Sequence, residues 1–141
     1  MSRSTSRAYK LKLSDKGIRL FLDNHCRICR LAGDLLSYGA TLHSAMVLLA
    51  NASDEDLVAE IIRAEIPTFG GTQIRYVGTS QTLSDVMATL TARISETGVV
   101  HPAPQSWKLF IAGLCSMQSA EDRDIRRAYD NLMATMANVK A

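Results

Sequence analysis

The most regular stretch of the chain is residues 14–38, SDKGIRLFLDNHCRICRLAGDLLSY, and its pattern is that of an amphipathic helix. Ser14 is a good N-cap, and Asp15 places a negative charge at the positive end of the helix dipole. We expect a helix from about residue 15 to Tyr38 that ends at Gly39. Its apolar residues recur at spacings of three, four and seven: Ile18, Phe21, Leu22, Ile28, Cys29, Ala32, Leu35 and Leu36.

The residues just before this helix alternate between apolar and basic. Tyr9, Leu11 and Leu13 fall on one side, and Lys10 and Lys12 fall on the other. This alternation is typical of a short strand, or of an extended arm that becomes ordered against a partner. Residues 1–8 are rich in Ser and Arg, and we expect a mobile basic arm there.

After residue 38 the chain reads as further helices with short connections. Residues 42–50 are apolar almost all round, which is typical of a helix buried in a core or an interface. Residues 73–77, after a glycine turn, form either a single strand or a packed loop. No internal repeat is visible in the sequence. We expect the next three helices to start at Thr41, at Ser53 and at either Thr82 or Ser84. The second of these should stop before Pro67 and the third at Gly98, and two more helices are expected over residues 107–115 and 125–136.

The composition fits one globular domain. The chain has 141 residues, of which 47% are hydrophobic and only 6% aromatic, so its core is aliphatic and suits helix-on-helix packing. We therefore expect an all-α fold, a compact bundle of five to six helices with a short extended N-terminal arm and one candidate strand near residues 73–77. Residues 9–141 would form the single helical domain and residues 1–8 the arm.

The cysteine count and the hydropathy bear on the compartment. Three cysteines, an odd number, argue for free thiols in a reducing environment. The basic N-terminus is not followed by an apolar run of signal-peptide length, and the longest apolar run is too short to span a bilayer. We expect a cytoplasmic protein that makes no membrane contact.

Charge is unevenly distributed along the chain. The net charge is +2, but the first thirty residues hold eight basic and two acidic side chains. Such asymmetry suggests a basic surface that meets an anionic partner, although a solvated tail of chance basicity explains it equally well. The residues expected to form a continuous stripe that binds nucleic-acid backbone are Arg7, Lys10, Lys12, Lys16, Arg19, Arg27 and Arg30. Docking of the same arm on an acidic protein is the other interpretation.

Catalytic and metal-binding patterns are weak. Cys26 and Cys29 form a C-x-x-C, but a structural zinc site needs a second pair of ligands. The remaining candidate ligands, His43, His101 and Cys115, are far apart in the sequence and form no such pair. No phosphate-binding loop, nucleophile elbow or dinucleotide fingerprint occurs. We expect a protein that is not an enzyme and that holds no metal and no cofactor.

The opening strand and helix resemble those of ribbon-helix-helix DNA-binding proteins. The resemblance implies that Tyr9, Leu11 and Leu13 form a ribbon whose other face, with Lys10 and Lys12, reads bases. The chain departs from that pattern because its first helix is too long and no clear turn leads to a second helix of the right size. In size, helicity and basic faces the chain is also similar to the helical small subunits of RNA-guided CRISPR effector complexes.

Two functions follow from these patterns. The first is a non-catalytic helical subunit of a nucleoprotein complex, which contacts DNA or RNA backbone through the basic arm and first helix. The alternative is a helical protein–protein adaptor, regulator or chaperone without nucleic-acid contact, suggested by the apolar segment 42–50. The expected partners are nucleic acid, and other protein subunits or further copies of the chain.

Overall fold

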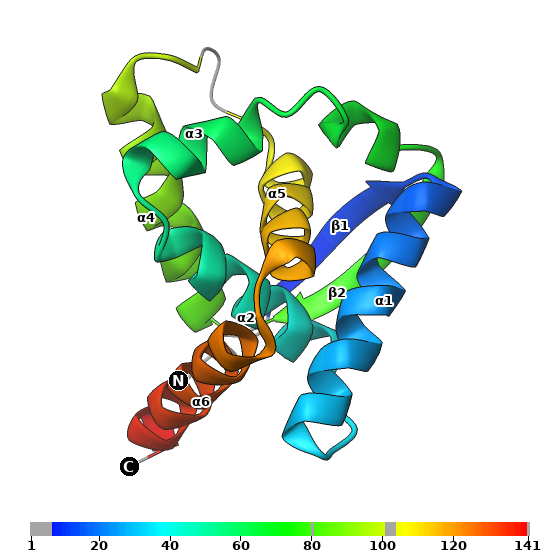
Figure 1. The fold of residues 1–141 in the computed structure, drawn as a ribbon, viewed down its shortest axis with the longest axis vertical. Helices are drawn as coiled ribbons and strands as arrows, with labels where there is room; N and C mark the ends of the chain where they lie inside the picture. Colours follow the sequence, from blue (N-terminus) through cyan, green and yellow to red (C-terminus); the bar gives the residue numbers. More distant parts are fainter. Residues whose placement is uncertain (1–6, 80, 101–103, 141) are drawn as a thin grey trace, which may run out of the picture.

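The computed structural model describes residues 7–79, 81–100 and 104–140 (Figure 1). Of these described residues 72% are helical, and they form six α-helices and one small antiparallel sheet. The helical bundle expected from the sequence is confirmed, and the all-α class is corrected to a mostly helical fold with a two-stranded sheet. The elements are β1 (Arg7–Leu13), α1 (Asp15–Ala32), α2 (Tyr38–Ala50), α3 (Asp54–Ile61), a 3-10 helix η1 (Ile66–Phe69), β2 (Gln73–Thr79), α4 (Gln81–Thr97), α5 (Ser106–Ser119) and α6 (Asp122–Lys140).

The two strands form an antiparallel ribbon. Their register runs from Arg7 opposite Thr79 to Leu13 opposite Gln73, with Lys10 opposite Tyr76 at the centre. The alternating residues 9–13 and the candidate strand at 73–77 are therefore two halves of one ribbon. Residues 7 and 8, which we assigned to the mobile arm, belong to β1, and residues 1–6 of that arm lie outside the described residues.

The first helix is shorter than its periodicity predicts. It ends at Ala32 because Gly33 adopts a left-handed conformation (φ 69°) and donates its amide to the carbonyls of Cys29 and Arg30. Our expected end at Tyr38 is wrong. Ser37 instead caps α2, which begins at Tyr38 and not at residue 42.

Of the other predicted helix boundaries, some are confirmed and some are wrong. Ser14 and Ser53 cap α1 and α3 as expected, and Gly98, with φ 69°, follows α4. Thr41 lies inside α2 and caps nothing, and α4 starts at Gln81, ahead of both Thr82 and Ser84.

The order of elements repeats. Each half of the chain contributes a strand followed by three helices, β1-α1-α2-α3 and then β2-α4-α5-α6. The strands and first helices correspond when Asp15, where α1 begins, is matched to Gln81, where α4 begins. The second and third helices correspond when Tyr38 of α2 is matched to Ser106 of α5. The segment 62–72, which contains η1, connects the two halves.

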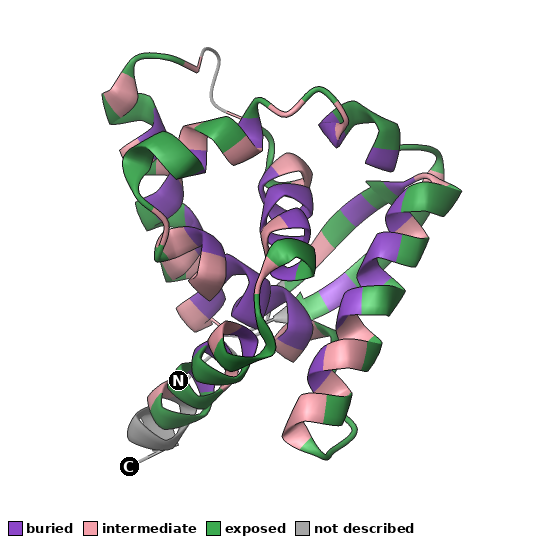
Figure 2. Ribbon diagram, in the orientation of Figure 1, coloured by how far each residue is buried: buried purple, intermediate pink, exposed green. Residues whose placement is uncertain are grey.

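Burial follows the same repeat, and Figure 2 shows buried residues concentrated on the central helices α2 and α5. When α1 and α4 are matched at their first residues, the buried Gly17, Phe21, Asn24 and Ile28 of α1 correspond to Leu83, Met87, Leu90 and Ile94, all buried on α4. When α2 and α5 are matched in the same way, every buried residue of α2 corresponds to a buried residue of α5. The repeat thus lies in which positions are buried, and hardly in which amino acids occupy them.

The halves are interleaved around an approximate twofold axis. In the ribbon, Lys10 lies opposite Tyr76, which is also its counterpart in the repeat, so the axis passes between them. Across this axis α1 packs against α5 and α2 packs against α4, while α2 and α5 cross at the centre. Helix α6 of the second half covers α1 and α2, and α3 of the first half covers α4 and α5.

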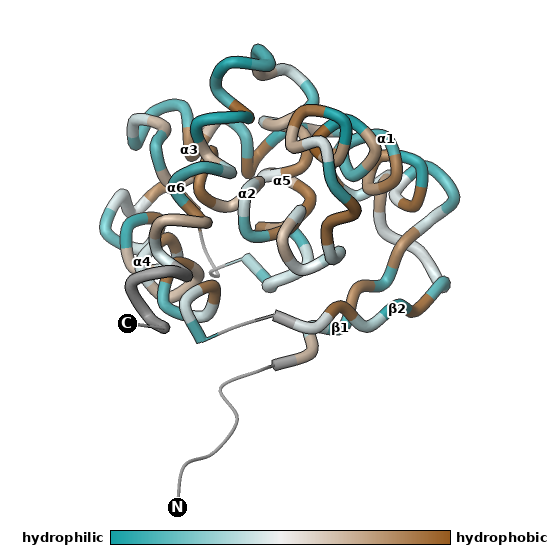
Figure 3. The backbone as a smooth tube through the Cα atoms, turned by 90° about the horizontal axis from the view of Figure 1, so that it is seen from below, coloured by the Kyte–Doolittle hydropathy of each residue, from teal (hydrophilic) through white to brown (hydrophobic). Residues whose placement is uncertain are grey.

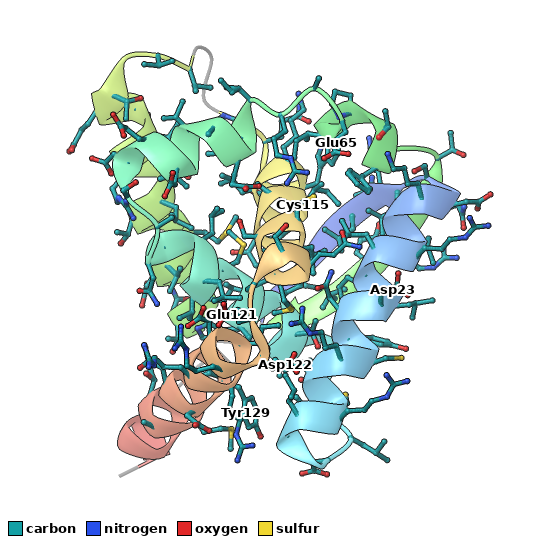
Figure 4. The ribbon with its side chains drawn as sticks, in the orientation of Figure 1. Asp23, Glu65, Cys115, Glu121, Asp122 and Tyr129 are labelled. Carbon is teal, nitrogen blue, oxygen red and sulfur yellow. The ribbon has the colours of Figure 1, made fainter. Side chains whose placement is uncertain are left out.

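A pair of arginine clamps joins the halves at equivalent places. Arg27 of α1 pairs with Asp122 (2.7 Å) and donates to the carbonyls of Met117 and Ala120 at the end of α5. Figure 4 shows Asp122 where the chain turns from α5 into α6, beside α1.

The second clamp has the same composition as the first. Arg93 of α4 pairs with Asp54 (2.8 Å) and donates to the carbonyls of Ala50 and Ala52 at the end of α2. Each clamp ties a first helix of one half to the second and third helices of the other, and it satisfies helix-end carbonyls that lack intrahelical partners.

The core lies between α2 and α5. Leu42, Met46 and Leu49 of α2 are fully buried, and a Cβ added at Gly113 of α5 would lie 2.8 Å from the sulfur of Met46. The apolar character of residues 42–50 is therefore accounted for by the interior of this fold. Among the described residues, no helix combines the length and apolar character needed to cross a bilayer.

Candidate nucleic-acid interface

The outer face of the ribbon is exposed and combines basic and apolar side chains. Successive strand residues point to opposite faces, so Lys10 and Lys12 of β1 share this face with Ile74 and Tyr76 of β2. Tyr76 is opposite Lys10, and the residue is 66% exposed. In Figure 3 the helices lie on one side of the two strands, and the other side is open.

The inner face of the ribbon is packed into the core, which fixes the outer face in position. Leu11, Leu13 and Val77 are buried. Two backbone hydrogen bonds hold the end of β1 to the segment that precedes β2. The Gly71 amide donates to the Lys12 carbonyl (3.2 Å), and the Ser14 amide donates to the Phe69 carbonyl (3.0 Å). The ribbon is thus a supported element, unlike an isolated hairpin, which is only marginally stable.

The positive charges on the outer face are unpaired. Neither Lys10 nor Lys12 forms an ion pair with a carboxylate in the described part of the chain. Asp15, the acid nearest to them in sequence, instead accepts a hydrogen bond from the Gln73 amide. The two ammonium groups therefore remain free for an external anion.

The seven predicted site residues lie on two elements, the ribbon and α1. Lys10 and Lys12 lie together on the ribbon, whereas Arg19 and Arg30 lie on α1. The Lys16 ammonium donates to the Thr68 hydroxyl (2.9 Å) and lies 4.5 Å above the Phe69 ring. For Arg7 the structure describes the backbone, in β1, and not the side chain.

Arg27 has a structural position. Its guanidinium is bound to Asp122 and to two carbonyls, so its donors are occupied within the fold. The sequence favours a pair between Asp23 and Arg27, because an acid four residues before a base is well placed on a helix. That pairing is wrong, since the acid comes from the start of α6, and we leave Arg27 out of the interface.

Two residues of the outer face, Ile74 and Tyr76, are missing from the prediction. Arg75 between them alternates toward the inner face, but its side chain is exposed and its guanidinium donates to the Ile74 carbonyl (2.9 Å). Residues 73–77 carry a strand signal of their own. Nothing local in the sequence pairs this strand with residues 7–13, so the second half of the face could not be placed.

Among the described residues, the cysteines, His25 and His43 do not assemble into a metal site, and the candidate His101 lies outside that part of the chain. His25 contacts the Thr41 hydroxyl (2.7 Å) and the Cys29 sulfur (3.7 Å), and burial lowers the pKa of His25. Cys26 is exposed, while burial raises the pKa of the Cys115 thiol to about 11 and keeps it protonated. Within the described ranges, no three His, Cys, Asp or Glu side chains are grouped to hold a metal ion.

The ribbon is the surface on which unpaired positive charge, an exposed aromatic ring and a rigid backbone coincide. Its groups are of the kind that contact phosphates and base edges. Comparison with protein-family models, with curated proteins and with solved structures finds no match to this chain.

Proposed function

We propose that the protein binds B-form DNA by placing the β1–β2 ribbon in the major groove. The observation that carries this proposal is the outer face of the ribbon, where Lys10, Lys12 and Tyr76 are exposed on a backbone fixed by the core. The major groove of B-DNA is wide enough for a two-stranded ribbon. A rigid ribbon also avoids the entropy cost of ordering a loop on binding.

The side chains on this face match the chemistry of base edges. A lysine ammonium binds the O6 and N7 acceptors of guanine, and apolar groups such as Ile74 contact the thymine methyl. Lys16 and Arg19 lie on the first two turns after β1, and they are the candidates for phosphate contacts. The protein would then belong to a nucleoprotein complex through its ribbon, with no catalytic role.

The shape of the ribbon favours DNA over RNA. The major groove of A-form RNA is too deep and narrow for side chains to read, and single strands are bound mainly by stacking on aromatic platforms. The outer face offers the ring of Tyr76 alone among its described side chains, which is a small platform. A small-subunit-like role in an RNA-guided complex would require affinity for single strands or RNA, and the experiment below measures it.

The two halves would contact different base sequences. At equivalent outer positions the first half carries Lys10 and Lys12, and the second half carries Tyr76 and Gly78. A target read by one chain would therefore lack twofold symmetry, and one chain would occupy one site. This distinguishes the protein from a homodimer, whose target mirrors its own symmetry.

The experiment is a selection from random duplexes followed by anisotropy titrations over a range of salt. We expect a non-palindromic duplex that binds more tightly than single-stranded DNA or RNA. Lys10→Ala/Lys12→Ala should lower affinity by about 100-fold and relax the preference for guanine at the base pairs that the two lysines contact. Tyr76→Ala should relax base preference and leave the salt slope unchanged.

The matched control removes the same charge elsewhere. Arg123→Ala/Arg127→Ala takes two exposed arginines from α6 and should change affinity less than about fivefold, because only long-range charge is lost. Equal losses in both double variants, or a preference for single strands, would refute the ribbon interface. Absence of nucleic-acid binding together with specific protein capture would support the adaptor alternative.

A further inference from the structure

The two halves differ at one inward-facing position of the ribbon, where Tyr9 corresponds to Arg75. The correspondence follows from the repeat that relates β1 to β2, in which Lys10 matches Tyr76. Tyr9 fills the space between the ribbon and the helices of the second half. Its ring packs edge-on against Phe110 (4.9 Å), and its hydroxyl bonds to the Ser84 hydroxyl (3.0 Å) on α4.

The corresponding space in the first half is not filled. Arg75 turns outward and donates to the carbonyl of its own neighbour Ile74, and its side chain is exposed. What remains is a pocket of about 160 Å³ between the ribbon, α1 and the start of α2. Its buried walls are Leu11, Leu13, Phe21 and Val77, and the more exposed Tyr38 and Arg75 lie at its rim.

We propose that this pocket binds a small aromatic carboxylate. A cavity of about 150 Å³ lined by apolar side chains is large enough for one benzene ring. The walls here are apolar, and the guanidinium of Arg75 has donors to spare and a planar geometry that matches a carboxylate. Tyr9 shows the fit, because at the equivalent place this fold already holds one aromatic ring with a polar group at its outer end.

The positive charge of Arg75 at the rim favours an aromatic acid over other ligands of the same size. A cationic ring would meet Arg75, and a neutral ring would leave its guanidinium without a new partner. An aliphatic acid would bury less apolar area against Phe21 and Tyr38. The proposal does not rest on DNA binding, and its test uses the aromatic probes alone, although Tyr76 lines this pocket as well as the outer face of the ribbon.

The test is a titration of the full chain with three probes, followed by backbone amide chemical shifts and calorimetry. Benzoate carries the ring and the charge, benzyl alcohol carries the ring alone, and acetate carries the charge alone. We expect benzoate to bind at least tenfold more tightly than benzyl alcohol, and acetate to show no saturation. The largest amide shifts should fall on Leu11, Ile18 and Phe21.

Two substitutions at one exposed position separate the ring from the charge. Arg75→Gln should weaken benzoate at least tenfold and leave benzyl alcohol unchanged. Arg75→Tyr introduces the residue of the other half, fills the pocket and should abolish binding of both probes. Melting temperatures no lower than that of the parent confirm that both variants fold.

Three results would overturn the site. These are benzoate affinity that survives Arg75→Gln, shifts that map to another surface, and a pocket occupied by a second copy of the chain. The last would be seen as a dimer in sedimentation that Arg75→Tyr disperses and that benzoate does not affect.

Discussion

The first and second halves of this chain fold alike and share few residues. Ile28 and Ile94 are both fully buried on equivalent turns, and so are Leu57 and Ile125 on the third helices. On the ribbon surface, by contrast, lysines stand where the other half has Tyr76 and Gly78. The comparison teaches that packing constrains where apolar groups lie, whereas the exposed positions are free to differ and to take on separate roles.

The interior of the two halves also differs in local volume and polarity. Gly17 corresponds to Leu83, and the polar pair His43 and Ser44 corresponds to Ile111 and Ala112. The first half thus carries a tighter contact and more buried polar groups at these positions than the second. Exchanging residues between equivalent positions measures what each difference contributes.

The largest effect is expected at the position of Gly17. A Cβ there would fall on the Phe69 carbonyl, whose oxygen already accepts the Ser14 amide. Gly17→Ala should lower the free energy of unfolding by about 3 kcal/mol, because backbone would have to move. Leu83→Ala, its counterpart, should lose a similar amount for the opposite reason, a cavity.

Urea denaturation of both variants checks this prediction. The control is Ala92→Gly on α4, away from its buried face, which should cost about 1 kcal/mol through helix propensity alone. If Gly17→Ala stays within about 0.5 kcal/mol of the parent, the range of ordinary surface substitutions, the close approach of α1 and η1 relaxes easily and the prediction is wrong.

The two arginine clamps should contribute equally. Arg27→Met and Arg93→Met keep the apolar stem and remove the guanidinium from its carboxylate and two carbonyls. Each should cost about 2 kcal/mol, because hydrogen bonds to charged groups are strong. The two losses should add, since the clamps share no partner.

Thermal or urea unfolding of the single and double variants tests that equality. Asp122→Asn and Asp54→Asn serve as controls that remove only the ion pair, and each should cost less than about 1 kcal/mol at these exposed carboxylates. If only one of the two variants loses stability, then equivalent contacts in the two halves contribute unequally to the free energy of unfolding.

A smaller, stabilising change is expected at Ser44. Its hydroxyl is buried and has no hydrogen-bond partner among the described residues, while Ala112 occupies the equivalent place. Ser44→Ala should raise the free energy of unfolding by about 1 kcal/mol, because an unsatisfied polar group is removed. Ser95→Ala on the exposed face of α4 is the control, and a destabilised Ser44→Ala would mean that the hydroxyl is satisfied by buried water.

The smallest effect concerns pH. Burial lowers the pKa of His43, so the unfolded chain takes up a proton on this side chain at a higher pH than the folded chain does. The stability is therefore fully present above the ordinary histidine pKa of about 6.5 and falls as the pH drops below it. His43→Ile, which copies Ile111, should flatten this fall without removing it, because burial lowers the pKa of His25 as well.

Denaturation at about pH 7.5 and about pH 5.5, on the two sides of the ordinary histidine pKa, measures the difference. His101→Gln is the control for histidine content. An unchanged pH dependence in His43→Ile would show that the pKa of His43 is the same in the folded and the unfolded chain, and the prediction would be wrong.

Local signals predicted the helices well and the assembly poorly. Ser14, Ser53 and Gly98 mark helix ends correctly because capping depends on a few adjacent residues. The end of α1 was missed because Leu35 and Leu36 continue its apolar stripe, yet Leu35 is 95% exposed beyond the helix. The pattern of apolar residues could not show that the left-handed turn at Gly33 comes first.

The candidate site was predicted in part for the same reason. Alternation in residues 9–13 placed Lys10 and Lys12 on the outward face. This alternation could not predict that Tyr76, far along the chain, lies opposite Lys10. It also could not show that Arg27 forms an ion pair with Asp122. The repeat stayed invisible because equivalent residues, such as Tyr9 and Arg75, differ in chemistry and agree only in position.

The segment 62–72 makes both strands of the ribbon part of one covalent molecule. A ribbon assembled from separate chains falls apart on dilution, whereas two strands of one chain meet at an effective concentration that does not depend on the protein concentration. Two unlike strands are thereby paired with each other in every molecule, and never each with its own kind. Dilution to nanomolar levels, about where DNA-binding proteins operate, would leave this ribbon intact.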